Sequence, residues 1–219
     1  MGMDFSQIVP SIPFILNGIW VTLQIVVISI LLGLVLGTLL ALLKIARNRF
    51  YNFIADAYTS VFRGTPLILQ LFIIFYAVPE ITGYNIPAYL AAVLAFGLNS
   101  SAYVSEIIRA GIQAVDKGQR EAAEALGIPY RNMMVKIILP QAMKNILPAL
   151  VNEFINLTKE SAIVTTVGVM DIMRRAYIVG ADTFSFLPAL LVAGAIYYVI
   201  VLVLSLLGKR LERRLKQSD

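Results

Sequence analysis

One acidic residue, Glu153, lies inside a long apolar run of this 219-residue chain. The run begins near Met143, so a helical rise of about 1.5 Å per residue places Glu153 roughly 15 Å deep. Since the hydrocarbon core of a membrane is about 30 Å thick, the carboxylate is expected near its midplane. An ionisable group at that depth is a functional candidate, and it could pair with the guanidinium, ammonium or imidazolium of a cationic solute.

Glu153 also has structural interpretations. It could form an internal ion pair with Lys159 or Arg109, or it could be protonated and hydrogen-bonded to Asn156. In these cases the solute need not be a cation.

Two further polar side chains are expected at a similar depth. Counted from the outer ends of their apolar runs, Gln70 lies about 13 Å deep and Asn99 about 16 Å deep. Polar groups of this kind are costly against lipid, so they should face protein or a wet cavity. Three helices therefore bring polar groups toward one level of the membrane.

The sequence Arg63-Gly64-Thr65-Pro66 interrupts the apolar run that carries Gln70. Such a break can expose backbone groups that bind the carboxylate or ammonium of an amino acid. A simple proline kink, with Arg63 reaching lipid phosphate, is the alternative. The candidate solute-contacting residues are Glu153, Gln70, Asn99, Thr65, Leu67, Tyr103, Ser100 and Asn156.

Composition excludes several chemistries. The chain has no cysteine and no histidine, which removes disulfides, thiol nucleophiles, zinc sites and histidine acid–base catalysis. It also lacks the G-x-x-x-x-G-K-[ST] phosphate-binding loop, so we do not expect it to hydrolyse ATP. The chain is expected to be no enzyme, with no catalytic residue, metal ligand or cofactor of its own.

Long charge-free runs indicate an all-α membrane protein. Hydrophobic residues make up 59% of the chain and charged residues 14%, and the mean hydropathy is +0.81. We read no cleavable signal peptide and one domain, 1–219. Five transmembrane helices are expected, at about 14–43, 58–79, 86–105, 143–158 and 183–208.

The segment 161–170 is too short to cross a membrane. We favour a re-entrant gate there, because Thr165, Thr166 and Gly168 suit backbone that faces a cavity, and an interfacial loop is the alternative.

Basic residues orient the spans. The loop after the first span, the polar segment that follows the third and the C-terminal tail hold 13 of the 18 lysines and arginines. The positive-inside rule then places the N-terminus outside and the C-terminus in the cytoplasm. Asp171, Arg174 and Arg175 fall in an outer loop, where they could contact a solute-binding protein or form a solvated charged loop.

A polar loop at about 113–142 is predicted to form a cytoplasmic helical hairpin. Residues 119–126 suit a helix, and Gly127 followed by Pro129 should end it. Residues 131–138 can form a second helix, and Pro140 marks the entry to the fourth span.

The spacing of this hairpin resembles the EAA loop of ABC-transporter permease subunits, E-A-A-x3-G-x9-I-x-L-P. Segments 62–67 and 152–161 resemble the polar amino acid permeases of the histidine/glutamine/arginine uptake type. Ala162 departs from the leucine that many relatives carry there. Every fixed position of the loop is matched, by Glu121, Ala122, Ala123, Gly127, Ile137, Leu139 and Pro140.

The resemblance implies a fold similar to the methionine-permease-type importer core, located in the inner (plasma) membrane of a prokaryote. It also implies partners: an ABC ATPase subunit in two copies that carries the ATP and magnesium, a second permease subunit, and an extracytoplasmic solute-binding protein. The EAA loop would be the coupling helix that docks on the ATPase. A homodimer is the expected pairing, and no nucleic acid partner is expected.

The cargo is expected to be a basic amino acid (arginine, lysine or histidine) carried by alternating access, with Glu153 pairing its cation. A glutamine or other neutral polar amino acid importer is the alternative if Glu153 is structural. A stand-alone channel or secondary transporter is a remote alternative, since it would not need the hairpin.

Overall fold

The computed structural model describes residues 5–46 and 48–216, which form helices joined by short connections, with no strand among them. Four long helical stretches are long and apolar enough to cross a membrane, and a bent pair of shorter helices brings the number to five. The all-α, multi-span prediction is confirmed. The long helices are α2 (Gly18–Ile45), α6 (Ala88–Gln113), α9 (Leu139–Glu160) and α11 (Phe186–Lys216).

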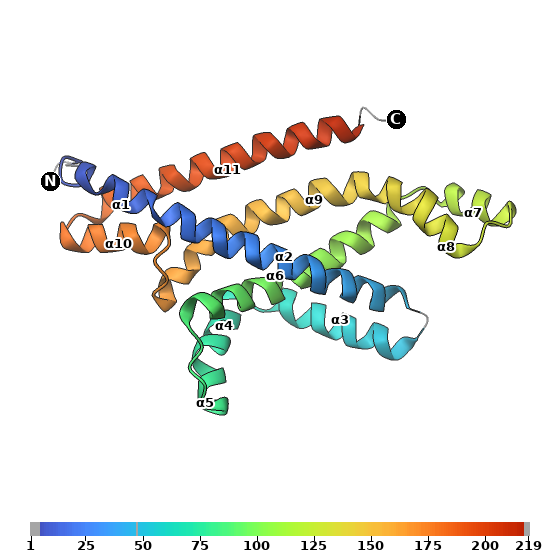
Figure 1. Ribbon diagram of the computed structural model, residues 1–219, viewed down its shortest axis with the longest axis horizontal. Coiled ribbons are helices and arrows are strands. Elements are labelled where there is room, and N and C mark those ends of the chain that lie inside the picture. Colours follow the sequence, from blue (N-terminus) through green and yellow to red (C-terminus); the bar gives the residue numbers. More distant parts are fainter. Residues whose placement is uncertain (1–4, 47, 217–219) are drawn as a thin grey trace.

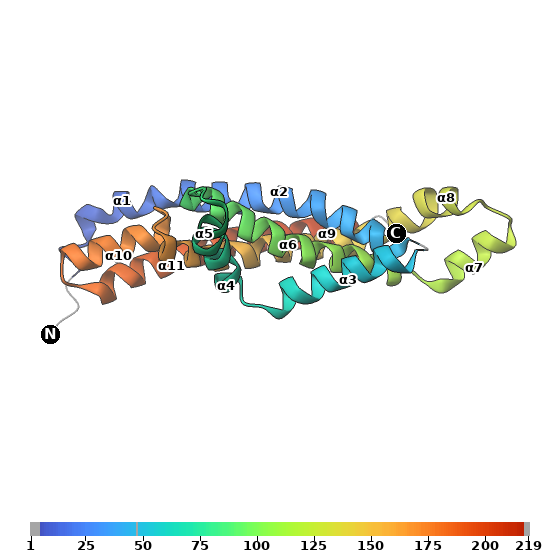
Figure 2. The same cartoon turned by 90° about the horizontal axis from the view of Figure 1, so that it is seen from below.

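The long helices run along the longest axis of the molecule, and the hairpin predicted at 113–142 projects at one end (Figures 1 and 2). The last residues of α2 and of α11 lie toward that same end, whereas α1 (Ile12–Leu16) and α10 (Ile172–Asp182) lie at the other. The basic segments therefore gather at the hairpin end, which the positive-inside rule assigns to the cytoplasm.

Close packing of α2 against α6 forms the centre of the fold. Gly33 and Gly37, four residues apart on one face of α2, let the two helices approach. A Cβ built on Gly33 would come within 2.9 Å of Ser100, and one on Gly37 within 2.7 Å of Val104. Around this contact Ile25, Val26, Leu71, Phe96 and Leu157 are buried in the largest apolar cluster.

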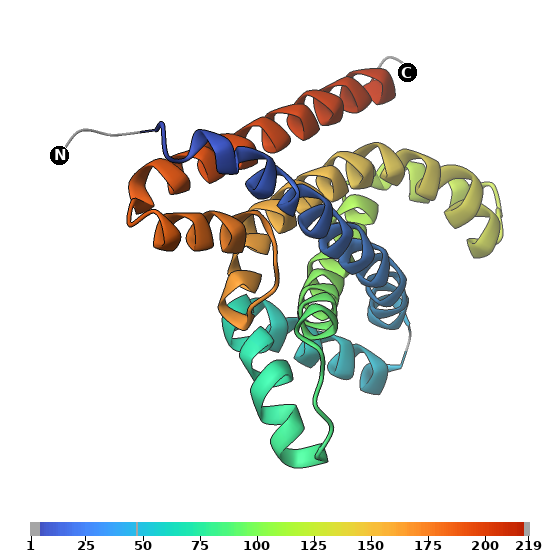
Figure 3. The ribbon, with the colours of Figure 1, turned by 60° about the vertical axis from the view of Figure 1, so that its left-hand side comes forward.

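The predicted second span, 58–79, starts too late, whereas the interruption predicted at 63–66 is present as a sharp bend. Its first limb, α3 (Arg49–Gly64), begins nine residues earlier than predicted. The second limb, Leu67–Thr82, begins with α4 (Leu67–Phe72) and makes an angle of 103° with the first. Thr65 and Pro66 are both extended, because proline disfavours helical backbone in the residue before it. Beyond α4, η2 (Ile73–Ala77) and α5 (Val78–Thr82) complete an arm that stands away from the other helices (Figure 3).

Two π-helical turns each precede a proline. Residues Ile73–Ala77 lead to Pro79, and η3 (Met134–Ile138) leads to Pro140. A proline ring clashes with the carbonyl four residues earlier, and a wider turn gives that carbonyl room. Because the wider turn of η3 accommodates the ring of Pro140, the second hairpin helix continues into the fourth span without a break.

The predicted outer loop is largely the helix α10. Asp171 was expected to be solvent-facing, but it is fully buried as the N-cap of that helix. Its Oδ1 accepts a hydrogen bond from the Arg174 backbone N–H at 2.8 Å, and its Oδ2 accepts one from the Tyr197 hydroxyl at 3.1 Å. A cap and a tyrosine hydroxyl therefore satisfy this carboxylate, and contact with a binding protein through Asp171 is ruled out in this conformation.

The segment 161–170 begins with a 3-10 helix, η4 (Ser161–Val167), which extends α9 and ends at Gly168 with φ of +84°. Val164, Val167 and Val169 join the central apolar cluster. The segment therefore turns back against the bundle. Whether it acts as a gate stays a prediction.

Candidate functional site

The hairpin predicted at 113–142 is formed by α7 (Lys117–Ala125), α8 (Tyr130–Met133) and η3. The Asp116 side chain accepts a hydrogen bond from the Gly118 N–H at 2.8 Å and caps the start of α7. Gly127 follows with φ of +68°, and the Ile128 N–H donates to the Ala123 carbonyl at 3.0 Å. This is the glycine-terminated helix end that the sequence predicted.

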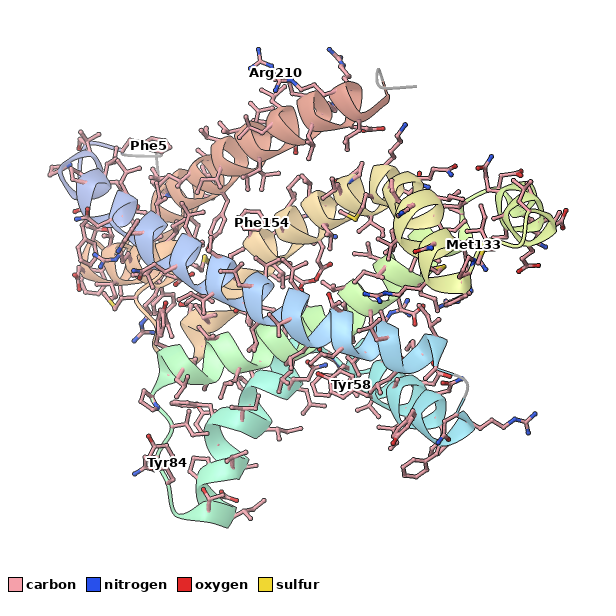
Figure 4. The ribbon with its side chains drawn as sticks, turned by 45° about the vertical axis from the view of Figure 1, so that its right-hand side comes forward. Phe5, Tyr58, Tyr84, Met133, Phe154 and Arg210 are labelled. Atoms are coloured by element: carbon pink, nitrogen blue, oxygen red, sulfur yellow. The ribbon has the colours of Figure 1, made fainter. Side chains whose placement is uncertain are left out.

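The two helices of the hairpin hold each other through a small apolar core. Ala123, Met133 and Ile138 are buried in it, and Figure 4 shows Met133 on the hairpin between its two limbs. Ala123 therefore packs inward and is not part of the exposed surface. On the outer side Glu121, Ala122, Gly127 and Pro140 are exposed, whereas Ile137 and Leu139 are half-buried.

Two apolar side chains at the tip of the hairpin were not singled out from the sequence. Leu126 is 78% exposed and Tyr130 is 62% exposed, one on each side of the Gly127 turn. Their position is a consequence of that turn, which sequence spacing alone does not show. With Ala122 they give the hairpin an apolar contact surface.

Gln70 and Asn99 are brought together, but they bond to the backbone at the helix break. The Gln70 Nε2 donates to the Phe62 carbonyl at 2.9 Å and to the Thr65 hydroxyl at 2.9 Å. The Asn99 Nδ2 donates to the same Phe62 carbonyl at 3.0 Å and to Gln70 Oε1 at 3.0 Å. Because Pro66 carries no N–H, these amides satisfy acceptors that the broken helix leaves open.

These contacts give the group a structural role at the break, and contact of its members with a solute stays a prediction. Thr65 lines a small groove at the break with Gln70, and Leu67 is buried in the central apolar cluster. The depth estimate for Gln70 took the limb from Gln70 to Pro79 as a direct continuation of α3, whereas the two limbs meet at a bend of 103°. Backbone exposed at the break is largely satisfied by the protein itself.

Glu153 is buried where α9 meets α6. The Ser100 hydroxyl donates a hydrogen bond to Glu153 Oε1 at 3.1 Å. Of the internal partners considered from the sequence, Arg109 instead pairs with Glu106 and Gln113, while Lys159 and Asn156 are exposed. The described residues therefore give Glu153 a hydrogen-bond donor but no paired cation.

Polar residues form an exposed stripe on the membrane-spanning part of α9. Asn145, Asn152 and Asn156 lie seven and four residues apart, so they share one face of the helix. Exposed amides are costly in lipid, which means that this face needs protein or water as its neighbour. Asn145 and Asn152 were missed from the sequence, although their spacing could have revealed them.

A groove of about 580 Å³ opens between α6 and α9 at the hairpin end of this stripe. Arg63 and Tyr103 line one wall, with the guanidinium 5.4 Å from the ring centroid, and Asn145 lines the other. Tyr103 is thus accessible in this groove, and its contact with a solute stays a prediction. Glu106, which also lines the groove, pairs with Arg109 at 2.6 Å.

A partly buried ion cluster ties the inner ends of α2, α3 and α6 together. Lys44 was counted as a loop charge, yet its side chain is only 4% exposed. It contacts Glu106, Asp56 at 3.3 Å and the Thr59 hydroxyl at 2.8 Å. Tyr58 adds a second tie between α3 and α6, since its hydroxyl donates to the Leu98 carbonyl at 2.9 Å.

Known proteins of similar sequence agree with this architecture. The profile of the family described as binding-protein-dependent transport system inner membrane component matches residues 29–217. The arginine transport system permease protein ArtQ of Bacillus subtilis is 59% identical over the full length of both chains. A protein of Rickettsia conorii provisionally named glutamine transport system permease protein GlnP is 52% identical over 94% of both chains.

Solved structures give the same result. A crystal structure of an amino acid ABC transporter with histidines contains a chain that is 44% identical, with a TM-score of 0.95 over 98% of this chain and 100% of that one. An inward-facing MetNI methionine ABC transporter matches at 22% identity, with a TM-score of 0.77 over 91% of this chain and 95% of that one. At that identity the second match shows a shared fold only.

Proposed function

The chain belongs to the family of binding-protein-dependent transport system inner membrane components, and from that premise we propose that it carries basic amino acids. It is a multi-pass membrane protein and the permease of an amino acid ABC importer. The proposal adds the cargo: arginine, lysine or histidine, driven by ATP through alternating access in the inner membrane of a prokaryote.

The observation that carries the proposal is the position of Glu153. Its carboxylate lies within the span and accepts a hydrogen bond from Ser100, and no cation among the described residues pairs with it. The preceding residue along α9, Asn152, belongs to the exposed polar stripe of that helix. A cationic solute on that face would supply the missing charge. The 59% identical arginine permease supports this cargo, whereas the relative named for glutamine supports the neutral alternative.

The solute path in this proposal follows the polar stripe of α9 toward the groove between α6 and α9. Glu153, Ser100, Tyr103 and Asn156 remain solute-contacting candidates. Gln70, Asn99, Thr65 and Leu67 position α4 instead, because their polar groups are engaged at the helix break or their side chains are buried in the core.

The kinds of partner follow from the family, and the number of copies of each is part of the proposal. An ATPase subunit, in two copies with ATP and magnesium, would dock on the hairpin surface formed around Ala122, Leu126 and Gly127. A second copy of this chain would cover the polar face of α9, and an extracytoplasmic binding protein would deliver the amino acid.

Replacing Glu153 with glutamine tests the cargo. Removing a charge-assisted hydrogen bond of about 1.5–3 kcal/mol should lower the apparent affinity for arginine by roughly 10- to 150-fold. Radiolabelled uptake in cells expressing the whole importer measures this. Glu80→Gln, which removes an exposed charge on the α4–α5 arm, is the matched control and should leave uptake unchanged. Unchanged arginine and lysine uptake in Glu153→Gln would rule out the cation role.

A further inference from the structure

Helix α11 has an outer face that nothing in the described chain covers. It packs on α9 and α10 along one side and forms an edge of the molecule (Figure 1). On the other side its large apolar side chains are exposed over several turns. These are Tyr198, Val199, Leu202, Val203, Leu206 and Leu207.

The length of this apolar face matches a bilayer. From Phe186 to Leu207 the helix rises about 33 Å at 1.5 Å per residue, close to the hydrocarbon thickness of about 30 Å. Aromatic side chains mark the outer boundary, where the rings of Phe186 and Tyr177 contact each other at a tilt, with their centroids 5.3 Å apart. Phe184, which is close to them in the sequence, is 95% exposed. Its φ of +50° is a left-handed backbone conformation that is unusual for a bulky residue. Aromatic rings are typical of the membrane interface.

At the inner boundary the exposed face changes from apolar to basic within one turn. Gly208 packs toward Val151, and the residues that follow it on the outer side are cations. A groove of about 390 Å³ combines both characters, lined by Leu206, Leu207, Lys209, Arg210 and Arg213. Arg210 extends away from the bundle at this end (Figure 4).

We propose that this groove binds an anionic phospholipid of the cytoplasmic leaflet. The phosphate would lie among Lys209, Arg210 and Arg213, and an acyl chain would run along Leu206 and Leu207. The lipid phosphate is negative and the groove is positive, so their charges attract. Two copies of the chain packed through this face about a two-fold axis would instead place the cations of one copy against those of the other, which favours lipid as the occupant. The polar stripe on α9 is the face that requires protein or water.

The test measures lipid binding to the purified full-length chain in detergent. Native mass spectrometry counts the lipids retained from an equal mixture of phosphatidylglycerol and phosphatidylcholine. The wild-type chain should retain phosphatidylglycerol preferentially. Replacing Arg210 and Arg213 together with glutamine should weaken this binding by roughly 25-fold, about fivefold for each cation lost.

Two matched variants separate a lipid site from general charge. Arg131→Gln with Lys136→Gln removes two exposed cations from the hairpin and should leave the preference unchanged. Arg210→Lys with Arg213→Lys keeps the charge and should retain phosphatidylglycerol, which guards against loss through misfolding. Equal retention of the two lipids by the wild-type chain, or undiminished phosphatidylglycerol binding in the double glutamine variant, would overturn the proposal.

Discussion

At the scale of single residues, two amide side chains have a structural role that depth alone could not reveal. Gln70 and Asn99 lie at buried positions on α4 and α6, where the sequence predicted polar groups facing protein or a cavity. That part is confirmed, since both are buried. Their targets are backbone carbonyls at a helix break, and which acceptors a break leaves open depends on a bend that the sequence does not specify.

Gln70→Leu is therefore expected to destabilise the chain without changing its selectivity. The carbonyls of Phe62 and Thr65 would lose a buried donor, at a cost of about 1–3 kcal/mol in the free energy of unfolding. Denaturant unfolding in detergent measures this, and Gln113→Leu at an exposed site is the control, with less than about 0.5 kcal/mol expected. A change in the arginine-to-glutamine uptake ratio at unchanged stability would instead make Gln70 a solute contact.

Glu153 is the candidate site residue whose location could be predicted best from the sequence. Its place within a span was predicted from the apolar run that carries it, and its side chain is buried in the structure. Its donor, Ser100, comes from a helix 53 residues away, so only the packing of α6 on α9 shows the contact. The polar stripe beside it could have been found from the spacing of Asn145, Asn152 and Asn156.

At the scale of elements, the hairpin at 113–142 was predictable because its signals are local. A cap, a glycine and two prolines lie within 25 residues and fix where each helix begins and ends. The α3–α4 bend is different: a proline predicts an interruption, but the 103° angle comes from the packing of α4 on α6. The close contact of α2 with α6 through Gly33 and Gly37 likewise depends on which helix lies opposite.

Gly127→Val should uncouple the hairpin from its ATPase. Valine is disfavoured at the φ of +68° that Gly127 adopts, so the turn that presents Leu126 and Tyr130 must change. We expect the ATPase subunit to be lost when the tagged permease is purified from cells.

Gly83 offers a control with the same backbone strain. It holds φ of +71° with no atom near its absent Cβ, and it lies on the α4–α5 arm. Gly83→Val should lower stability to a similar degree and keep the ATPase bound. Loss of the ATPase in both variants would show that strain, and not the hairpin surface, causes it.

At the scale of the whole molecule, the described chain exposes two surfaces of opposite character on its membrane-spanning helices. The apolar outer face of α11 suits lipid, whereas the polar stripe of α9 does not. We therefore expect a second copy of the chain to cover α9 and leave α11 at the periphery of the assembly.

The absence of native cysteine makes this arrangement testable. Asn156→Cys on the polar stripe should give a covalent dimer with a bifunctional maleimide, and Leu202→Cys on α11 should not. Both positions are exposed, so reaction with a monofunctional maleimide checks access to each. A dimer formed at Leu202→Cys alone would reverse the assignment of the two faces.

ATP-driven uptake by the reconstituted importer tests the central claim most directly. Proteoliposomes holding the permease, its ATPase and its binding protein are supplied with labelled arginine or labelled glutamine. We predict that arginine accumulates only when ATP is provided, and at least tenfold more than glutamine. Preferential accumulation of glutamine, or arginine uptake that persists without ATP, would contradict the account.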